Sequence, residues 1–156
     1  MKALLDTIVL DWLITDKKFD KLSSNALDVI FDDTTTLLLS VVSLWEMSNH
    51  VREGIFVIDQ SFNQFFEEVI SEFDIEVLPI EMKAIEYMST FDYAIIEKPF
   101  QRTEKGKTIA GVKRELHRDP FDRMIISHAI TMDIPVISPD TYFETYKKSN
   151  GLKLIW

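Results

Sequence analysis

Residues 2–14, KALLDTIVLDWLI, decide the expected fold, because they join a strand pattern directly to a helix pattern. Lys2–Leu5 is a short apolar run, which predicts a buried strand. Thr7–Ile14 is apolar on most sides and predicts a largely buried helix. Asp6 stands between them, so the order along the chain is strand, acidic residue, helix.

The same alternation continues along the rest of the chain. Further strands are predicted at Thr36–Val42, Ile75–Leu78, Ile134–Ile137 and Leu152–Trp156. Helices are predicted at Asn25–Phe31, from Ser43 onward, from the capping residue Ser61 to about Phe73, and at Glu81–Phe91, Phe121–Thr131 and Thr141–Tyr146. Alternating strands and helices indicate an α/β fold with a mostly parallel central sheet flanked by helices on both faces.

Length and composition predict one globular domain over residues 1–156. Hydrophobic residues make up 46% and charged residues 28%, which is an ordinary balance for a folded domain. The chain has no cysteine, which excludes disulfides and thiolate metal sites. The N-terminus has no secretory pattern and no apolar run approaches the ~20 residues of a membrane span, so we expect a soluble, cytoplasmic protein without a membrane partner.

The formal charge of −9 is unevenly distributed along the chain. Between Lys98 and Arg118 there are seven basic and two acidic side chains, which gives a local charge of +5. Gly106 and Gly111 lie in this polar stretch, which predicts a mobile loop. The local charge fits a segment that binds a polyanion such as nucleic acid, and it fits a solvated loop equally well.

Four acidic residues fall where one edge of the predicted sheet would lie. Asp6 directly follows the first predicted strand, and Asp140 follows the Ile134–Ile137 strand after Ser138 and Pro139. Glu46 lies four residues past the strand that ends at Val42. Asp122 stands in the first turn of the helix that precedes the Ile134–Ile137 strand. Because ligands of open α/β sheets bind at the carboxyl ends of the strands, these acids are candidates for one shared site.

Each acid also fits a purely structural role. Ser43 and Glu46 have the spacing of a capping box, in which the serine caps a helix and the glutamate bonds back to its start. Asp119 before Pro120 is typical of a helix N-cap, and Asp122 would favour the positive end of the same helix. For a single acid, capping is the simpler interpretation, so the functional interpretation depends on the whole set.

The set as a whole favours a divalent metal. Carboxylates brought close together repel one another, and either their pKa values rise or a cation balances the charge. Mg²⁺ and Mn²⁺ prefer oxygen ligands, and Mg²⁺ commonly binds one or two carboxylates, several waters and a phosphate oxygen of the substrate. Such a metal would let an acidic protein bind and hydrolyse a phosphodiester.

Four short segments of the chain carry the motifs on which a resemblance to a known family depends. They are Leu4–Thr7, Ser43–Met47, His117–Ala129 with its DPFDR sequence, and Ser138–Asp140. Together they resemble PIN-domain nucleases, in particular the VapC-type toxins of bacterial toxin–antitoxin pairs, over nearly the whole chain. The resemblance implies a PIN fold, an Mg²⁺- or Mn²⁺-dependent endoribonuclease acting on tRNA or other structured RNA, a homodimer, and a cognate antitoxin protein that covers the site.

The resemblance also implies roles for individual residues. Asp6, Glu46 and Asp122 match the three acids that bind the metal and carry catalysis, and Asp140 matches a fourth, more variable position. Asp119 is expected to orient a water or cap the helix beneath Asp122, and Thr7 to hydrogen-bond near the metal. The side chains expected to contact RNA are Arg102, Lys105, Lys107, Arg118 and Arg123.

Two departures from the family pattern affect the substrate and the partner. Ile8 stands where related proteins often have a polar residue, so one polar contact is missing. The stretch from Phe91 to Arg118 is longer than the usual link. Substrate choice and the docking of an antitoxin therefore stay open.

Three other functions fit parts of the sequence. A metal-free ribonuclease mechanism needs two paired imidazoles, but His50, His117 and His128 stand in unrelated contexts, and ordinary structural or surface roles are expected for them. A non-catalytic RNA- or protein-binding module on the same fold predicts gaps in the set of acids, and the sequence has none. A nuclease of RNA processing or DNA metabolism that works without an antitoxin stays open.

Overall fold

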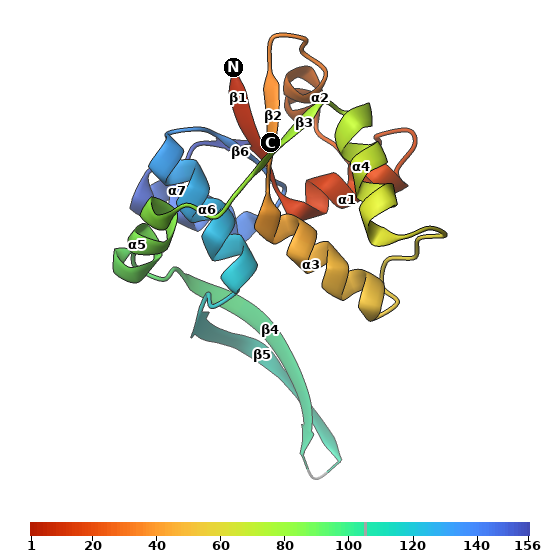
Figure 1. Cartoon of the computed structure of the whole chain (residues 1–156). Coiled ribbons are helices and arrows are strands. Elements are labelled where there is room, and N and C mark those ends of the chain that lie inside the picture. Colours follow the sequence, from red (N-terminus) through yellow and green to blue (C-terminus); the bar gives the residue numbers. More distant parts are fainter. Residues whose placement is uncertain (105) are drawn as a thin grey trace.

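The computed structural model describes residues 1–104 and 106–156, and in that part of the chain five strands form one parallel sheet (Figure 1). The strands are β1 (Lys2–Leu5), β2 (Thr36–Ser40), β3 (Ile75–Leu78), β6 (Val136–Ile137) and β7 (Leu154–Ile155). Their order across the sheet is β3-β2-β1-β6-β7, and each neighbouring pair runs parallel. β1 therefore lies at the centre, and the predicted parallel sheet is confirmed.

Helices cover both faces of this sheet. Side chains alternate along β1, so Ala3 and Leu5 belong to one buried apolar cluster and Leu4 to another. The first cluster is formed with α1 (Thr7–Thr15), α2 (Ser24–Ile30), α3 (Val41–Arg52) and α4 (Phe62–Glu72). The second is formed with α5 (Met82–Thr90), α6 (Pro120–Met132) and α7 (Thr141–Asn150). No helix in the described residues is long and apolar enough to cross a membrane.

The basic segment differs from the prediction, because most of it is a β-hairpin and not a loop. β4 (Ile95–Glu104) and β5 (Lys107–Leu116) pair antiparallel in continuous register and extend away from the sheet (Figure 1). Each strand has ten residues and is therefore about 34 Å long. We call this pair of strands the hairpin.

The two glycines that suggested a loop have different roles in the hairpin. Gly106, just before β5, has a φ of +76°, a conformation that favours glycine. Gly111 lies within β5 opposite Phe100, and a Cβ at this position would come 3.0 Å from the ring. Gly111 therefore leaves the space that the Phe100 ring occupies against the neighbouring strand.

Candidate active site

Asp6 and Asp140 follow the neighbouring central strands β1 and β6. Because these strands pair in parallel, both leave the sheet at the same edge. The Ser138 hydroxyl donates a hydrogen bond of 2.5 Å to Oδ2 of Asp6 and accepts one of 3.0 Å from the backbone N–H of Asp140. Oδ1 of Asp140 in turn accepts a hydrogen bond from the backbone N–H of Tyr142 and caps α7. Ser138, which sequence reasoning missed, therefore connects the two acids.

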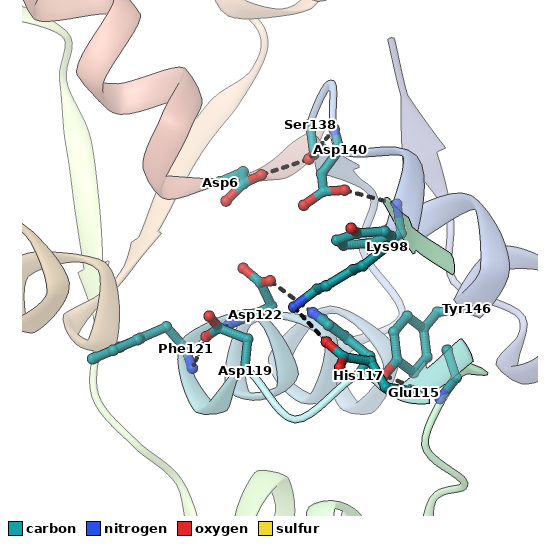
Figure 2. Close-up of polar contacts among 12 residues, drawn as sticks. Asp6, Lys98, Glu115, His117, Asp119, Phe121, Asp122, Ser138, Asp140 and Tyr146 are labelled. Atoms are coloured by element: carbon teal, nitrogen blue, oxygen red, sulfur yellow. Dashed lines mark hydrogen bonds and ion pairs between the residues drawn. The ribbon is translucent and has the colours of Figure 1, made fainter. Parts of the chain in front are cut away.

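Asp119 and Asp122 lie at the start of α6 and point toward this same edge. Oδ1 of Asp119 accepts hydrogen bonds from the backbone N–H groups of Phe121 (2.9 Å) and Asp122 (3.4 Å), so its predicted capping role is confirmed. Figure 2 shows the carboxylates of Asp122, Asp6 and Asp140 facing a common space. Asp122 therefore belongs to the group of acids at the sheet edge.

Glu46 lies in the second turn of α3 and is not a helix cap. The helix begins at Val41, two residues before the predicted start, and the Ser40 hydroxyl caps it by accepting a hydrogen bond from the backbone N–H of Val42. Ser43 is buried inside the helix, so the capping-box interpretation of Ser43 and Glu46 is wrong. In the described part of the chain, the buried Oε2 of Glu46 has no hydrogen-bond partner.

All these acids line one cavity of about 660 Å³. The five acids that were predicted are Asp6, Glu46, Asp119, Asp122 and Asp140, and the structure brings them together from four separate segments. Much of the remaining lining is apolar and comes from α1 and from α3 and the segment after it, including Trp12, Met47 and Ile55. The cavity therefore combines an acidic side with an apolar side.

A second cavity, of about 730 Å³, opens at the base of the hairpin. It shares Asp119, Asp122 and Asp140 with the first cavity. Its other lining includes Lys98 and Arg118, so this side of the acids is polar and has basic groups. The three shared acids therefore lie between a largely apolar cavity and a more polar one that has two basic side chains on its lining.

Burial and mutual repulsion make negative charge unfavourable at the acids. Burial, with a contribution from the charges of Asp122 and Asp140, raises the pKa of Asp6 to about 7, although the hydrogen bond from Ser138 opposes the rise. Burial also raises the pKa of Asp122, and the charge of Asp140 adds to this effect. The pKa of Glu46 is raised by burial and by the charge of Asp122, although the neighbouring Thr7 side chain opposes the rise. A cation at this position would relieve all three effects.

The donor set fits a hydrated divalent ion. Among the described residues, Oε2 of Glu46 and Oγ1 of Thr7 are both buried without a hydrogen-bond partner. Within residues 1–104 and 106–156, no three acidic or histidine side chains stand close enough together to hold a metal ion by themselves. Mg²⁺ does not need such a cage, because it retains several waters and binds through one or two carboxylates.

His117 contacts Asp122 directly, which sequence reasoning missed. Its side chain is only 3% exposed, although it follows an exposed basic segment. Nε2 of His117 lies 3.0 Å from Oδ2 of Asp122, and Nδ1 lies 3.1 Å from the Tyr146 hydroxyl. That hydroxyl also accepts a hydrogen bond of 3.3 Å from the backbone N–H of Ala94. The base of the hairpin and Asp122 therefore belong to one hydrogen-bonded network.

The basic residues that were expected to contact RNA have different environments. Arg118 is exposed and lines the second cavity beside the acids. The guanidinium of Arg123 lies 3.9 Å from the centre of the Tyr93 ring, so it packs against an aromatic side chain. Arg102 and Lys107 lie on the hairpin, and Lys105 is outside the described residues.

Comparison with known proteins agrees with this architecture. A sequence model of the PIN domain family matches residues 3–149, and no curated protein matches the chain. Among solved structures, a chain of VapBC2 from Rickettsia felis, bound to a DNA fragment from its promoter, has a TM-score of 0.57 and 20% identity over 99% of this chain and 97% of that one. A chain of VapBC-1 from nontypeable Haemophilus influenzae has a TM-score of 0.54 and 12% identity, over 99% and 96% respectively.

Proposed function

The chain belongs to the PIN domain family, and from this premise we propose that it is a divalent-metal-dependent endoribonuclease and the toxin of a toxin–antitoxin pair. The observation that carries the proposal is the convergence of five acids on one cavity, with a buried Glu46 oxygen that lacks a partner among the described residues. The fold shared with VapBC proteins supports the toxin–antitoxin part.

We assign the metal site to the group of Asp6, Glu46, Asp122 and Asp140, of which one or two would bind Mg²⁺ or Mn²⁺ directly and the others through its bound waters. When bound, the ion supplies an activated water and neutralises charge on the phosphate. Ser138 holds the Asp6 carboxylate in position, and His117 does the same for Asp122. Asp119 fixes the start of α6 beneath Asp122, and Thr7 lines the same cavity as the acids.

The partners in this proposal are an RNA substrate, such as tRNA or another structured RNA, and an antitoxin protein that covers the cavity. The apolar side of the cavity suits side chains of a protein, because Ile8 and Ile55 are 40% and 68% exposed there. A homodimer and a cytoplasmic location, both expected from the sequence, remain part of the proposal. We also propose that residues 1–156 act as one nuclease domain.

The test is incubation of metal-free protein with total RNA, with and without Mg²⁺ or Mn²⁺, followed by mapping of the cut ends. We expect cleavage only with added metal, and products with a 5′-phosphate, because the attacking group is water. A cyclic phosphate product would contradict this proposal, since it requires attack by the 2′-hydroxyl. Cleavage of DNA in preference to RNA would instead favour a role in DNA metabolism.

A further inference from the structure

The hairpin has two faces of different chemistry, because side chains alternate along each strand. One face contains the even-numbered residues of β4 and the odd-numbered residues of β5, and we call it the inner face because its Lys98 and Glu115 line the cavity that also contains Asp122. The outer face contains the other residues of the two strands. Four of the five basic side chains on the described strands lie on the inner face; these are Lys98, Arg102, Lys107 and Lys113. The outer face has one, Arg114, and otherwise presents mostly apolar and uncharged side chains.

Positive charge is in excess on the inner face. Lys98 and Lys113 stand directly opposite each other and share one acid, because Glu115 contacts both ammonium groups, at 2.9 and 2.8 Å. The single charge of Glu115 offsets only one of these two ammonium charges, so one positive charge is left that an anion such as a phosphate can neutralise. Arg102 also pairs with an inner-face acid, Glu104, at 3.4 Å, so four basic side chains face two acids on the inner face. On the outer face, Arg114 is balanced by Glu97 at 2.8 Å.

The inner face continues into the candidate active site. Lys98 and Glu115, at the base of the hairpin, line the same cavity as Asp122 and Asp140. Figure 2 shows the Lys98 side chain reaching toward Asp122. A chain of phosphates that lies along the inner face would therefore arrive at the acids without crossing the apolar cavity.

We propose that the inner face of the hairpin binds the phosphodiester backbone of the RNA substrate and leads it to the acids. The inference rests on the proposed function and adds the path of the substrate. The half-buried Phe100 ring lies between Lys98 and Arg102 on this face, with the Arg102 guanidinium 5.9 Å from the ring centre. Proteins that bind single-stranded nucleic acids combine aromatic rings, on which the bases stack, with cationic side chains, which neutralise the phosphates.

The test compares two neighbouring residues that point to opposite faces. Lys113→Gln and Arg114→Gln each remove one positive charge and one glutamate ion pair, from side chains that are 55% and 77% exposed. Binding to bulk tRNA is measured in EDTA at several KCl concentrations, and the RNA is recovered to show that it is intact. We expect Lys113→Gln to lower the salt slope by about 0.7 and the affinity by about fivefold at 0.1 M KCl, while Arg114→Gln leaves both unchanged.

The inference is overturned if the two variants bind tRNA alike, or if Arg114→Gln has the larger effect. A single-stranded DNA of matched length serves as the second probe, and tighter binding of DNA than of tRNA would overturn the assignment to RNA. Equal melting temperatures of the two variants show that both are folded. Binding is measured without metal, so these results do not depend on cleavage. Failure of the proposed function has a different sign, because the RNA would then stay intact when Mg²⁺ is added to the wild-type protein.

Discussion

The five acids come from four segments spread between residues 6 and 140, whereas the hairpin is one continuous segment, residues 95–116, whose strands pair with each other. The acids are brought together only by the complete sheet, and burial raises the pKa of Asp6, Glu46 and Asp122. The hairpin side chains are mostly exposed. Under the proposed function, this difference predicts that the acids of the folded core determine the rate of cleavage and that the hairpin determines the affinity for RNA.

The largest expected effect is on the rate of RNA cleavage, without a change in RNA binding. Asp122→Asn should lower RNA cleavage in Mg²⁺ by about a thousandfold, equivalent to about 4 kcal/mol, because a metal-binding charge is lost with little change in shape. Single-turnover cleavage and RNA binding are measured together, and binding should be retained. The control is Asp133→Asn, at the opposite end of the same helix, where the residue is in the left-handed conformation that asparagine tolerates. Cleavage by Asp122→Asn at the normal rate would refute the site assignment.

A second effect concerns the stability of the metal-free protein. The pKa of Asp6 is about 7 in the folded protein, above the ordinary aspartate value of 3.8 expected for the unfolded chain, so the folded state holds this proton more tightly. Stability should therefore fall as the pH rises from about 4 to about 7, and added Mg²⁺ should oppose the loss at neutral pH. Melting temperatures across this range are the measurement. In Asp6→Asn the pH dependence should become flatter; an unchanged profile would show that other groups cause it.

The connection between the two regions can be tested at Tyr146. Tyr146→Phe keeps the ring in the core and removes the hydroxyl that contacts His117 and the Ala94 N–H. We expect cleavage to fall by about 10–100-fold through a lower kcat, because His117 no longer holds Asp122 as firmly. His117→Gln should reduce kcat in the same way. A change in KM with an unchanged kcat would place this network in substrate binding instead.

The smallest expected effect is on the affinity for tRNA, without a change in the rate of cleavage. Arg102→Gln combined with Lys107→Gln should weaken tRNA binding by about twentyfold at 0.1 M KCl, if each side chain contacts one phosphate. The rate of cleavage at saturating RNA should stay the same, because neither residue lies at the acids. Binding titrations and single-turnover rates separate the two quantities. A lower saturating rate would show that the hairpin also takes part in chemistry.

The sheet and the grouping of the acids could be predicted because both follow from local patterns. Apolar runs separated by helical segments predict parallel strands, and parallel strands bring their carboxyl ends to one edge. Asp6 and Asp140 could therefore be placed together although they lie far apart in sequence. The predicted cap of the helix after Ser61 was confirmed for the same reason, since it involves only neighbouring residues.

The errors have three different physical causes. Val41 and Val42 have strand-forming side chains, yet α3 begins there because Ser40 supplies the cap. The hairpin strands could not be predicted because they contain many charged residues and a glycine, and they lack a continuous apolar face. An exposed ribbon forms its backbone hydrogen bonds without such a face. The burial of His117 depends on Tyr146, 29 residues away, and no local pattern predicts it.

The hairpin leaves and rejoins the domain at a single point. The backbone N–H of His117 donates a hydrogen bond of 2.8 Å to the carbonyl of Ala94, so the residues that flank the two strands are direct neighbours. We therefore expect that the outer part of the ribbon can be shortened, lengthened or exchanged without shifting any strand of the central sheet, whereas Lys98 and Glu115 at its base line the cavity of the acids. If the proposed function is correct, changes in the outer ribbon would alter RNA binding and leave the group of acids in place.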